Sequence, residues 1–156
     1  LAERVQRAAI YETPGHVDLF IHNGSYGASA ALLQAVQDVI DGVRDDNTNA
    51  WAGGYRPAGM RVDVQTMTDL PFDIDLELTA SMGASVPTIT ATLTAKLSAW
   101  LHAAMPGRAI RPIDIINQAL GVDGVAAATV LAPTATHVVA ASTVLYLRTL
   151  TLTWTA

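Results

Sequence analysis

The sequence predicts an α+β fold of two small consecutive units, each a mixed sheet covered by helices. The first observation is an alternating apolar pattern at residues 16–22 and again at 60–66, with a helical pattern between them. The second is that residues 69–156 open with the same order, a strand and then a helix, and go on with a second helix and two more strands. A period of two indicates strands and a period near 3.6 indicates helices, so residues 1–68 and 69–156 are each expected to combine a sheet with helical cover.

The first unit is predicted to run strand, helix, strand. A strand at 16–22 is followed by a turn and then by a helix, with Ser29 in the N-cap position and Gly42 in the C-cap position. A polar connection, 43–59, leads to the second strand at 60–66. A crossover of this length suits parallel or next-but-one strands, with the helix on one face of the sheet.

The second unit opens with the most regular alternation in the chain, at 71–80. Its even-numbered residues are apolar and are expected to face the core: Phe72, Ile74, Leu76 and Leu78. Its odd-numbered residues are polar and are expected to face outward: Asp73, Asp75, Glu77 and Thr79. A helix at 88–104 follows, with an apolar stripe of Ile89, Leu93, Leu97, Trp100 and Leu101. A short helix at 111–121 comes next, with Pro112 in its first turn.

The last two strands are predicted at 122–133 and 142–156. The eight residues between them predict an antiparallel hairpin. Alternation in the last strand groups Val144 with the candidate interface residues Tyr146, Leu150, Leu152 and Trp154. The opposite face is also partly apolar, which suits a strand covered on both sides or an edge offered to another subunit.

Composition restricts the possible classes of protein. The chain has 156 residues, of which 51% are hydrophobic, its net charge is −5, and it has no cysteine. These values argue against disorder, a basic nucleic-acid surface, a disulfide scaffold and a thiolate zinc site. No apolar run approaches the roughly 20 residues of a membrane helix, so neither nucleic acid nor membrane is an expected partner. The first residues carry no initiator Met or signal pattern, so the chain is expected to be a fragment of a longer protein.

The stretch "GGYRPAG", residues 53–59, raises the possibility of an anion site, since glycines stand beside Arg56. A strand follows it, whereas phosphate loops usually lead into a helix, so a turn set by Pro57 and Gly59 is favoured. The same backbone-setting role is expected at a group of turn residues: Arg56, Pro57, Gly59, Gly107, Gly121 and Gly124.

No residue pattern points to catalysis, a cofactor or a metal, and the chain is expected not to be an enzyme. Asp73, Asp75 and Glu77 could bind a cation, but alternate strand residues lie about 7 Å apart. A solvated face, or a charged face set against an arginine-bearing partner, is favoured. The four histidines are scattered, and His16 and His22 would stand about 20 Å apart on one strand, too far to bind one ion together.

The order of the turn motifs carries a resemblance to a known family. Five features follow one another: Pro14-Gly15, Arg56-Pro57-Ala58-Gly59, Gly107-Arg108, the helix with Ile113 and Ile116, and Gly121-Val122-Asp123-Gly124-Val125. In this order the chain resembles the carboxyl-terminal half of the baseplate J-like proteins, the wedge proteins of contractile phage tails and related injection machines.

The resemblance implies a virion structural protein of the tail baseplate, assembled in the host cytoplasm. It implies binding to other baseplate and tail proteins, in a homo-oligomer or ring that transmits a conformational signal to the sheath. Two other classes stay open. One is a small ligand-binding or enzymatic α+β domain, and the other is a secreted adhesion domain, which requires an export signal upstream.

Overall fold

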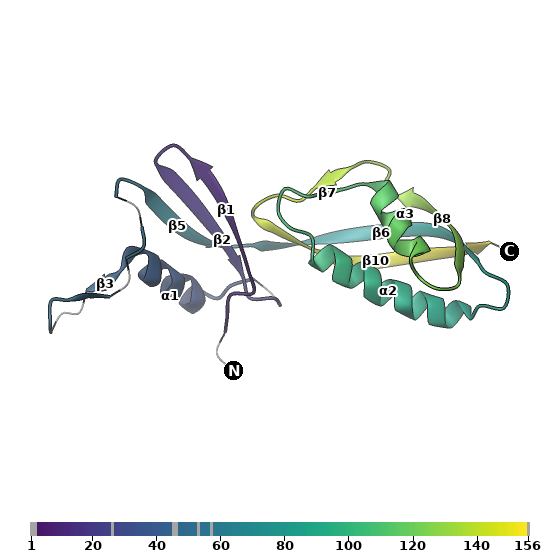
Figure 1. The fold of residues 1–156 in the computed structure, drawn as a ribbon, viewed down its shortest axis with the longest axis horizontal. Coiled ribbons are helices and arrows are strands. Elements are labelled where there is room, and N and C mark those ends of the chain that lie inside the picture. The colour runs from purple at the N-terminus through teal and green to yellow at the C-terminus, as the bar shows by residue number, and fades with distance from the viewer. Residues whose placement is uncertain (1–2, 26, 45–46, 53, 57, 156) are drawn as a thin grey trace. The chain divides into compact units, whose positions relative to one another are not determined.

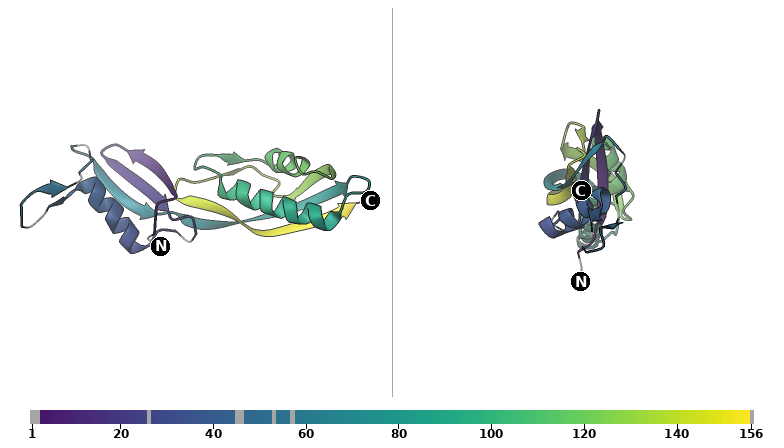
Figure 2. Two further views of the ribbon diagram at one scale, coloured as in Figure 1. Left: turned by 60° about the horizontal axis from the view of Figure 1, so that its bottom comes forward. Right: turned by 90° about the vertical axis from the view of Figure 1, so that its left-hand side faces the viewer.

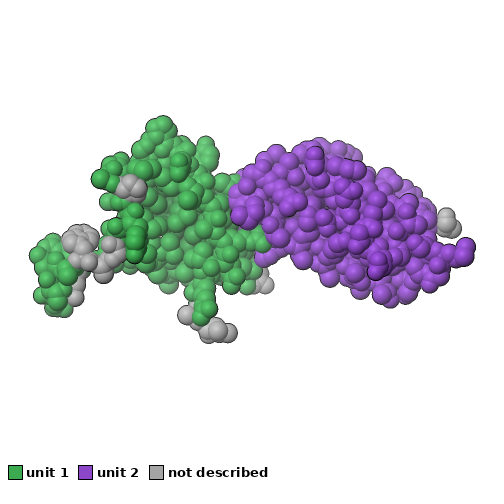
Figure 3. All heavy atoms as spheres, in the orientation of Figure 1, with its two compact units in different colours: residues 1–69, 141–143 green, residues 70–140, 144–156 purple. Residues whose placement is uncertain are grey.

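The computed structural model describes residues 3–25, 27–44, 47–52, 54–56 and 58–155. The chain divides into two compact units (Figure 3). Unit 1 comprises residues 1–69 with 141–143, and unit 2 comprises residues 70–140 with 144–156. Mixed sheets and helices occur in the described chain, which confirms the α+β class. A boundary between independently folding domains at residues 68 and 69 stays a prediction.

Unit 1 contains β1 (Arg7–Thr13), β2 (His16–His22), α1 (Ala30–Asp41) and β5 (Arg61–Thr66) (Figure 1). Its sheet has the order β1-β2-β5, with β1 antiparallel and β5 parallel to β2. The parallel crossover is therefore confirmed. The segment expected to be a plain connection contains a small antiparallel pair, β3 (Val43–Arg44) and β4 (Trp51–Ala52).

Strand β1 is absent from the sequence-based prediction. Most of its residues are exposed, because β1 is an outer strand of the sheet. A strand that buries few side chains has no need for a regular apolar alternation, so its sequence carries little of the usual signal. Its pairing with β2 through the turn at Gly15, whose φ is +80°, makes a hairpin.

Both predicted caps of α1 are confirmed. The Ser29 hydroxyl accepts a hydrogen bond from the Leu32 N–H at 3.2 Å. Gly42 has a φ of +85°, and its N–H donates to the Asp38 carbonyl at 2.8 Å. These bonds satisfy backbone groups that the first and last helical turns leave open, so α1 begins and ends where its capping residues dictate.

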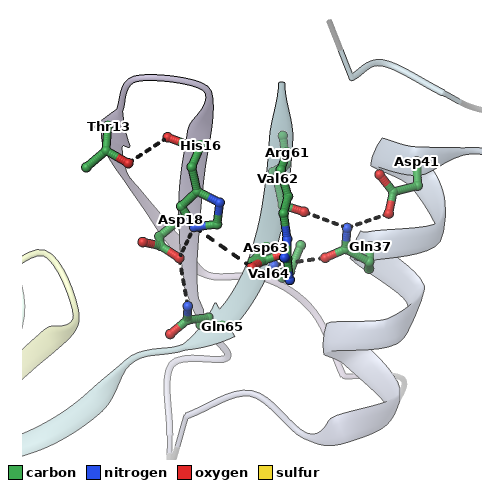
Figure 4. Close-up of polar contacts among 10 residues, drawn as sticks. All are labelled: Thr13, His16, Asp18, Gln37, Asp41, Arg61, Val62, Asp63, Val64 and Gln65. Carbon is green, nitrogen blue, oxygen red and sulfur yellow. Dashed lines mark hydrogen bonds and ion pairs between the residues drawn. The ribbon is translucent and has the colours of Figure 1, made fainter. Parts of the chain in front are cut away.

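Helix α1 is also tied directly to the backbone of β5 through Gln37. The Gln37 amide nitrogen donates to the Val62 carbonyl at 2.8 Å. The Gln37 amide oxygen accepts from the Val64 N–H at 2.9 Å (Figure 4). Since β5 is an outer strand, Gln37 supplies two bonds that a neighbouring strand would otherwise provide.

Unit 2 is built on β6 (Thr68–Ala80), which starts in the last residues of unit 1. The remaining elements are α2 (Val86–His102), β7 (Ala109–Ile110), α3 (Pro112–Leu120), β8 (Val125–Ala132), β9 (His137–Val138) and β10 (Thr143–Thr155). The large sheet has the order β10-β6-β8, and α2 lies lengthwise along it (Figures 1 and 2). Strands β7 and β9 form a separate small pair.

The predicted hairpin of the last two strands is wrong, because β6 lies between β8 and β10. Strand β8 is antiparallel to β6. Side-chain bonds join Asp73 to Arg148 and Thr79 to Thr155, so β10 runs parallel to β6. A long strand with a fully apolar face is most stable as the central strand, where both of its edges are paired. The connection from β8 to β10 is occupied by β9, which pairs with β7.

The core of unit 2 lies on one face of this sheet. All four even-numbered apolar residues of β6 are buried, as predicted. The predicted helical stripe is buried at Ile89, Leu93, Leu97 and Leu101. Trp100 is half-buried, and the Arg108 guanidinium lies 5.6 Å from its ring centre. Ile115 and Ala119 of α3 join the same cluster, so both helices cover one face. Burial of each large aliphatic side chain contributes about 1.5–3 kcal/mol.

The faces of β10 differ from the prediction. Leu145 is buried, Leu147 packs against the core, and Tyr146 is 40% exposed. Arg148 and Thr149 are both exposed, after which Leu150, Leu152 and Trp154 face the core. Two successive exposed residues shift the alternation by one position, as a β-bulge does. Tyr146 therefore does not share a face with Leu150, Leu152 and Trp154.

Candidate functional site

The register of β2 and β5 gathers polar side chains on one face of the first sheet. His16 lies opposite Arg61, and Asp18 lies opposite Asp63. Directly opposite residues point to the same face, so these side chains stand together, away from the face that buries Val17. Figure 4 shows His16, Asp18 and Asp63 converging from the two strands.

The distances within this cluster are short. His16 Nε2 lies 3.1 Å from Asp18 Oδ1 and 3.8 Å from Asp63 Oδ2. One nitrogen or oxygen atom from each of the three residues lies within 4.8 Å of the other two. The three side chains are between 21% and 34% exposed, so solvent reaches them.

Two neighbours orient the carboxylates of this cluster. The Gln65 amide nitrogen donates to Asp18 Oδ1 at 2.7 Å. Arg61 Nε donates to Asp63 Oδ1 at 2.9 Å. The hydrogen bond and charge of Asp63 raise the pKa of Arg61 above its usual value. Asp63 Oδ1 is thus occupied by Arg61, while Oδ2 faces His16.

A second histidine site in unit 1 is fully buried. His22 is 0% exposed, and its Nδ1 accepts from the Gly24 N–H at 2.9 Å. Because Nδ1 is an acceptor, the neutral ring carries its proton on Nε2 and donates to Asp69 Oδ1, which lies 3.0 Å away. The pair ties the end of β2 to the start of β6. The buried environment and two bonds of His22 favour a structural role.

The expected turn residues have distinct geometries. Gly59, Gly107 and Gly124 have φ values of +81°, +80° and +92°, in the left-handed region. A Cβ on Gly124 would lie 2.9 Å from Ile89 Cδ1, whereas one on Gly59 would meet nothing within 4 Å. Gly121 ends α3 with an ordinary φ of −80°. Pro57 and Gly53 of the candidate anion loop lie outside the described residues.

Arg56, the cation of the candidate anion loop, pairs with Asp41 at the end of α1. Its Nη1 lies 3.1 Å from Asp41 Oδ1, and its backbone N–H donates to the Ile40 carbonyl at 3.0 Å. These contacts attach the turn to the helix. The arrangement supports the turn interpretation of residues 54–56 and 58–59 over an anion site.

The acidic row of β6 is divided between different environments. Asp73 binds the Arg148 guanidinium in a two-pronged ion pair, with Arg148 Nε 2.9 Å from Asp73 Oδ1. Hydrogen bonds from Arg148, with a smaller contribution from Thr149, hold the pKa of Asp73 below its usual range. Within the part of the chain that the structure describes, Asp73, Asp75 and Glu77 do not form a three-ligand cluster.

A shallow pocket of about 370 Å³ lies beside α2 in unit 2, lined by Thr88, Thr92, Lys96 and Asp123 among others. The Lys96 ammonium donates to the Gly121 carbonyl at 2.7 Å and thereby caps the end of α3. Lys96, the cation that lines this pocket, therefore has a structural hydrogen bond at the end of α3.

Comparison with known families decides the identity of the larger unit. The model of the Baseplate J-like protein C-terminal domain matches residues 72–153, just over half of the chain. The chain belongs to the baseplate J-like protein family. The resemblance inferred from the order of the turn motifs is thus confirmed, and the family gives the chain a structural role in a phage tail baseplate. No curated protein matches the sequence.

The matched region of this baseplate J-like chain corresponds closely to unit 2, from the fifth residue of β6 to near the end of β10. The His16 cluster and the His22–Asp69 pair lie before it. None of the helices in the described residues of the baseplate J-like chain is long and apolar enough to cross a membrane.

Sequence reasoning missed the three polar arrangements of unit 1: the His16 cluster, the His22–Asp69 pair and the Gln37 bridge. Each joins residues more than 20 positions apart. The alternation of β2 and β5 does place Asp18 and Asp63 on outward faces. The alternation does not give the register of the two strands, and without the register the sequence cannot show that the two aspartates lie opposite each other.

Proposed function

We propose that this chain is a wedge component of the baseplate of a contractile phage tail or a related injection machine. It acts by binding neighbouring proteins in an oligomeric assembly, and it performs no catalysis. The observation that carries this proposal is the family match, which covers both helices and most of the large sheet of unit 2. The use of His22, Lys96 and Arg56 in structural contacts supports a role in assembly.

The outer edge of β10 is proposed as a contact surface. In the sheet order β10-β6-β8, strand β10 has β6 on one side only. An outer strand presents N–H and carbonyl groups that another chain can bind. The exposed residues of β10 include Tyr146, Thr149, Thr151 and Thr153, and β-branched and aromatic residues suit strand pairing.

The candidate interface residues then divide into two groups. Tyr146 is exposed and is proposed to contact a partner. Leu150, Leu152 and Trp154 pack against the core and are proposed to hold β10 straight on the sheet. In a complex, Tyr146 and the exposed threonines of β10 are therefore expected to contact the partner more than the three apolar residues do.

The test is light scattering of the chain alone and mixed with the baseplate proteins encoded beside it. Assembly is expected in at least one mixture. Tyr146→Asp should weaken it, while Tyr11→Asp serves as a matched control, because Tyr11 is a 56% exposed strand residue of unit 1. Amide hydrogen exchange in β10 should slow on assembly.

A chain that stays monomeric in every mixture, with unchanged exchange in β10, would contradict the assembly role. That result would favour the small ligand-binding or enzymatic alternative. Equal loss of assembly in both tyrosine variants would keep the assembly role and reject β10 as the contact.

A further inference from the structure

We propose that His16, Asp18 and Asp63 form a binding site for a divalent transition-metal ion, with Zn²⁺ as the best-suited ion. The site lies on the polar face of the first sheet, outside the matched family region. It goes beyond the proposed assembly function and departs from the expectation of no metal. The sequence alone does not show that residue 63 lies beside residue 18.

Charge is the first argument. Asp18 and Asp63 lie directly opposite each other on neighbouring strands. Like charges in this position destabilise a sheet unless a positive charge lies between them. The imidazole of His16 reaches both carboxylates, so the position between the three side chains is where a cation gains most.

Geometry is the second argument. Zinc binds imidazole nitrogen and carboxylate oxygen at about 2.0–2.2 Å. In tetrahedral or octahedral coordination, adjacent ligand atoms are therefore separated by roughly 2.8–3.6 Å. The His16–Asp18 and His16–Asp63 separations are 3.1 and 3.8 Å. Small side-chain rotations bring the three atoms onto one ion, and the ligand set of one imidazole and two carboxylates suits zinc.

The surrounding hydrogen bonds are the third argument. Ligands of metal ions are usually oriented by a further hydrogen bond from the protein. Gln65 provides one to Asp18. Arg61 binds Asp63 Oδ1 as an ion pair and leaves Oδ2 directed at His16, so Arg61 acts as a competing cation. Arg61 also brings a positive charge, and its side chain is 73% exposed. Its charge competes with the ion, which gives the site a distinctive response to substitution.

Bound zinc would fasten β2 to β5 across the α1 crossover. Three protein ligands leave at least one coordination position for water or for a side chain of a neighbouring protein. The absence of cysteine from the sequence removes thiolates as competitors for zinc. Solvent exposure of the three ligands leaves the site open to exchange of the ion.

The test is thermal melting of the chelator-treated chain during titration with zinc chloride, with calorimetry for stoichiometry. The expected result is one ion per chain and a saturable rise in Tm, because a ligand that binds the native state stabilises it. His16→Gln and Asp63→Asn should each remove the rise. Glu77→Gln is the matched control, since Glu77 is an outward strand carboxylate in unit 2 and should leave the rise unchanged.

Arg61→Ala separates a metal site from a simple cluster of charges. Removal of the competing guanidinium should tighten zinc binding several-fold. The proposal is overturned if zinc up to ~1 mM gives no saturable rise, which leaves Arg61 as the cation that balances the two carboxylates. It is equally overturned if His16→Gln binds zinc as the parent does. Since each variant is compared with and without zinc, a change in its basal Tm does not affect the result, and neither outcome bears on assembly through β10.

Discussion

The two large sheets share one plan but are stabilised in different ways. In each, the central strand has one antiparallel and one parallel neighbour: β2 lies between β1 and β5, and β6 lies between β8 and β10. Among the residues that the structure describes, unit 2 buries fifteen hydrophobic residues in one cluster. In unit 1 the buried hydrophobic residues among those described are Val17, Ile21 and Met67, and α1 contributes none.

Polar contacts contribute a larger share of the stability of unit 1. Gln37 binds the β5 backbone, His22 binds Asp69, and Glu3 accepts from Ser29 at the start of α1. The hydrogen bonds from Ser29 are the main reason that the pKa of Glu3 lies below its usual range. A net intramolecular hydrogen bond contributes about 0.5–1.5 kcal/mol, less than a buried leucine. We therefore expect unit 1 to be the less stable of the two.

The largest effect is expected in the apolar core of unit 2. Leu76 is 0% exposed, so Leu76→Asp would bury an unpaired charge and should reduce the free energy of unfolding by more than about 4 kcal/mol. Urea denaturation measures it, with Glu77→Gln as the outward-facing control. A parent-like midpoint would mean that the strand alternation of β6 is displaced by one residue.

A smaller but more selective effect is expected at His22. His22→Ala would leave the Gly24 N–H and the Asp69 carboxylate without their partner and should cost about 2–4 kcal/mol, from unsatisfied polar groups and a cavity. Hydrogen exchange should show faster opening of β1, β2 and β5 with β8 unchanged. Uniform acceleration in both units would indicate that they unfold as one, and would remove the distinction drawn between them.

Glycine turns provide a finer comparison of the units. Gly124→Ala combines positive φ with a contact of 2.9 Å to Ile89, whereas Gly59→Ala meets positive φ in open space. We expect Gly124→Ala to lower the free energy of unfolding by about 2–3 kcal/mol and Gly59→Ala by about 1–2 kcal/mol. Gly59→Val should lower it more than Gly59→Ala does. Arg56→Ala should cost under ~1 kcal/mol because its ion pair is partly exposed. Thermal melts of the four variants test this order, and a loss at Arg56 above that at Gly59 would mean that the Arg56–Asp41 pair or an anion contact outweighs the turn geometry.

The smallest effect is expected at the exposed Asp73–Arg148 pair. Hydrogen bonds from Arg148 lower the pKa of Asp73 in the folded chain, so its contribution is complete above the unfolded pKa and is lost as pH falls through the lower folded pKa. The Tm difference between the parent and Asp73→Asn should therefore be constant near neutral pH and shrink below about pH 4. Asp123→Asn, an exposed change in the same unit, is the control. A difference that grows in acid would have the wrong sign.

The apolar core of unit 2 could be predicted from the sequence better than the polar contacts of unit 1. In unit 2, a period of two at Phe72–Leu78 and a period of 3.6 at Ile89–Leu101 identified the buried faces, because apolar burial leaves a periodic pattern. Apolar periodicity does not give the order of strands in the sheet, because it does not show whether β10 pairs with β6 or with β8. The change in the burial alternation at Arg148 and Thr149 was also missed, because a one-residue shift leaves both faces of β10 partly apolar.

In unit 1, the apolar periodicity predicted β2, β5 and α1, and the residue types at the helix ends predicted the caps of α1. The periodicity could not predict the polar contacts between these elements. His16, Asp18 and Asp63 look like separate outward residues until the register of a parallel pair sets them together. Strand β1 gave little signal, because Ile10 and Tyr11 are both exposed in it. Sites formed by long-range polar contacts need the tertiary structure to be found.

The bridge from Gln37 has a consequence for how copies of this chain avoid one another. A side-chain amide reproduces the donor and acceptor of a peptide unit, and here it holds the Val62 carbonyl and the Val64 N–H of an outer strand. A foreign strand would have to displace that amide before it could extend the sheet along β5. The amide therefore protects this edge of the first sheet against unplanned strand pairing, whereas the outer edge of β10 is the one proposed to receive a partner.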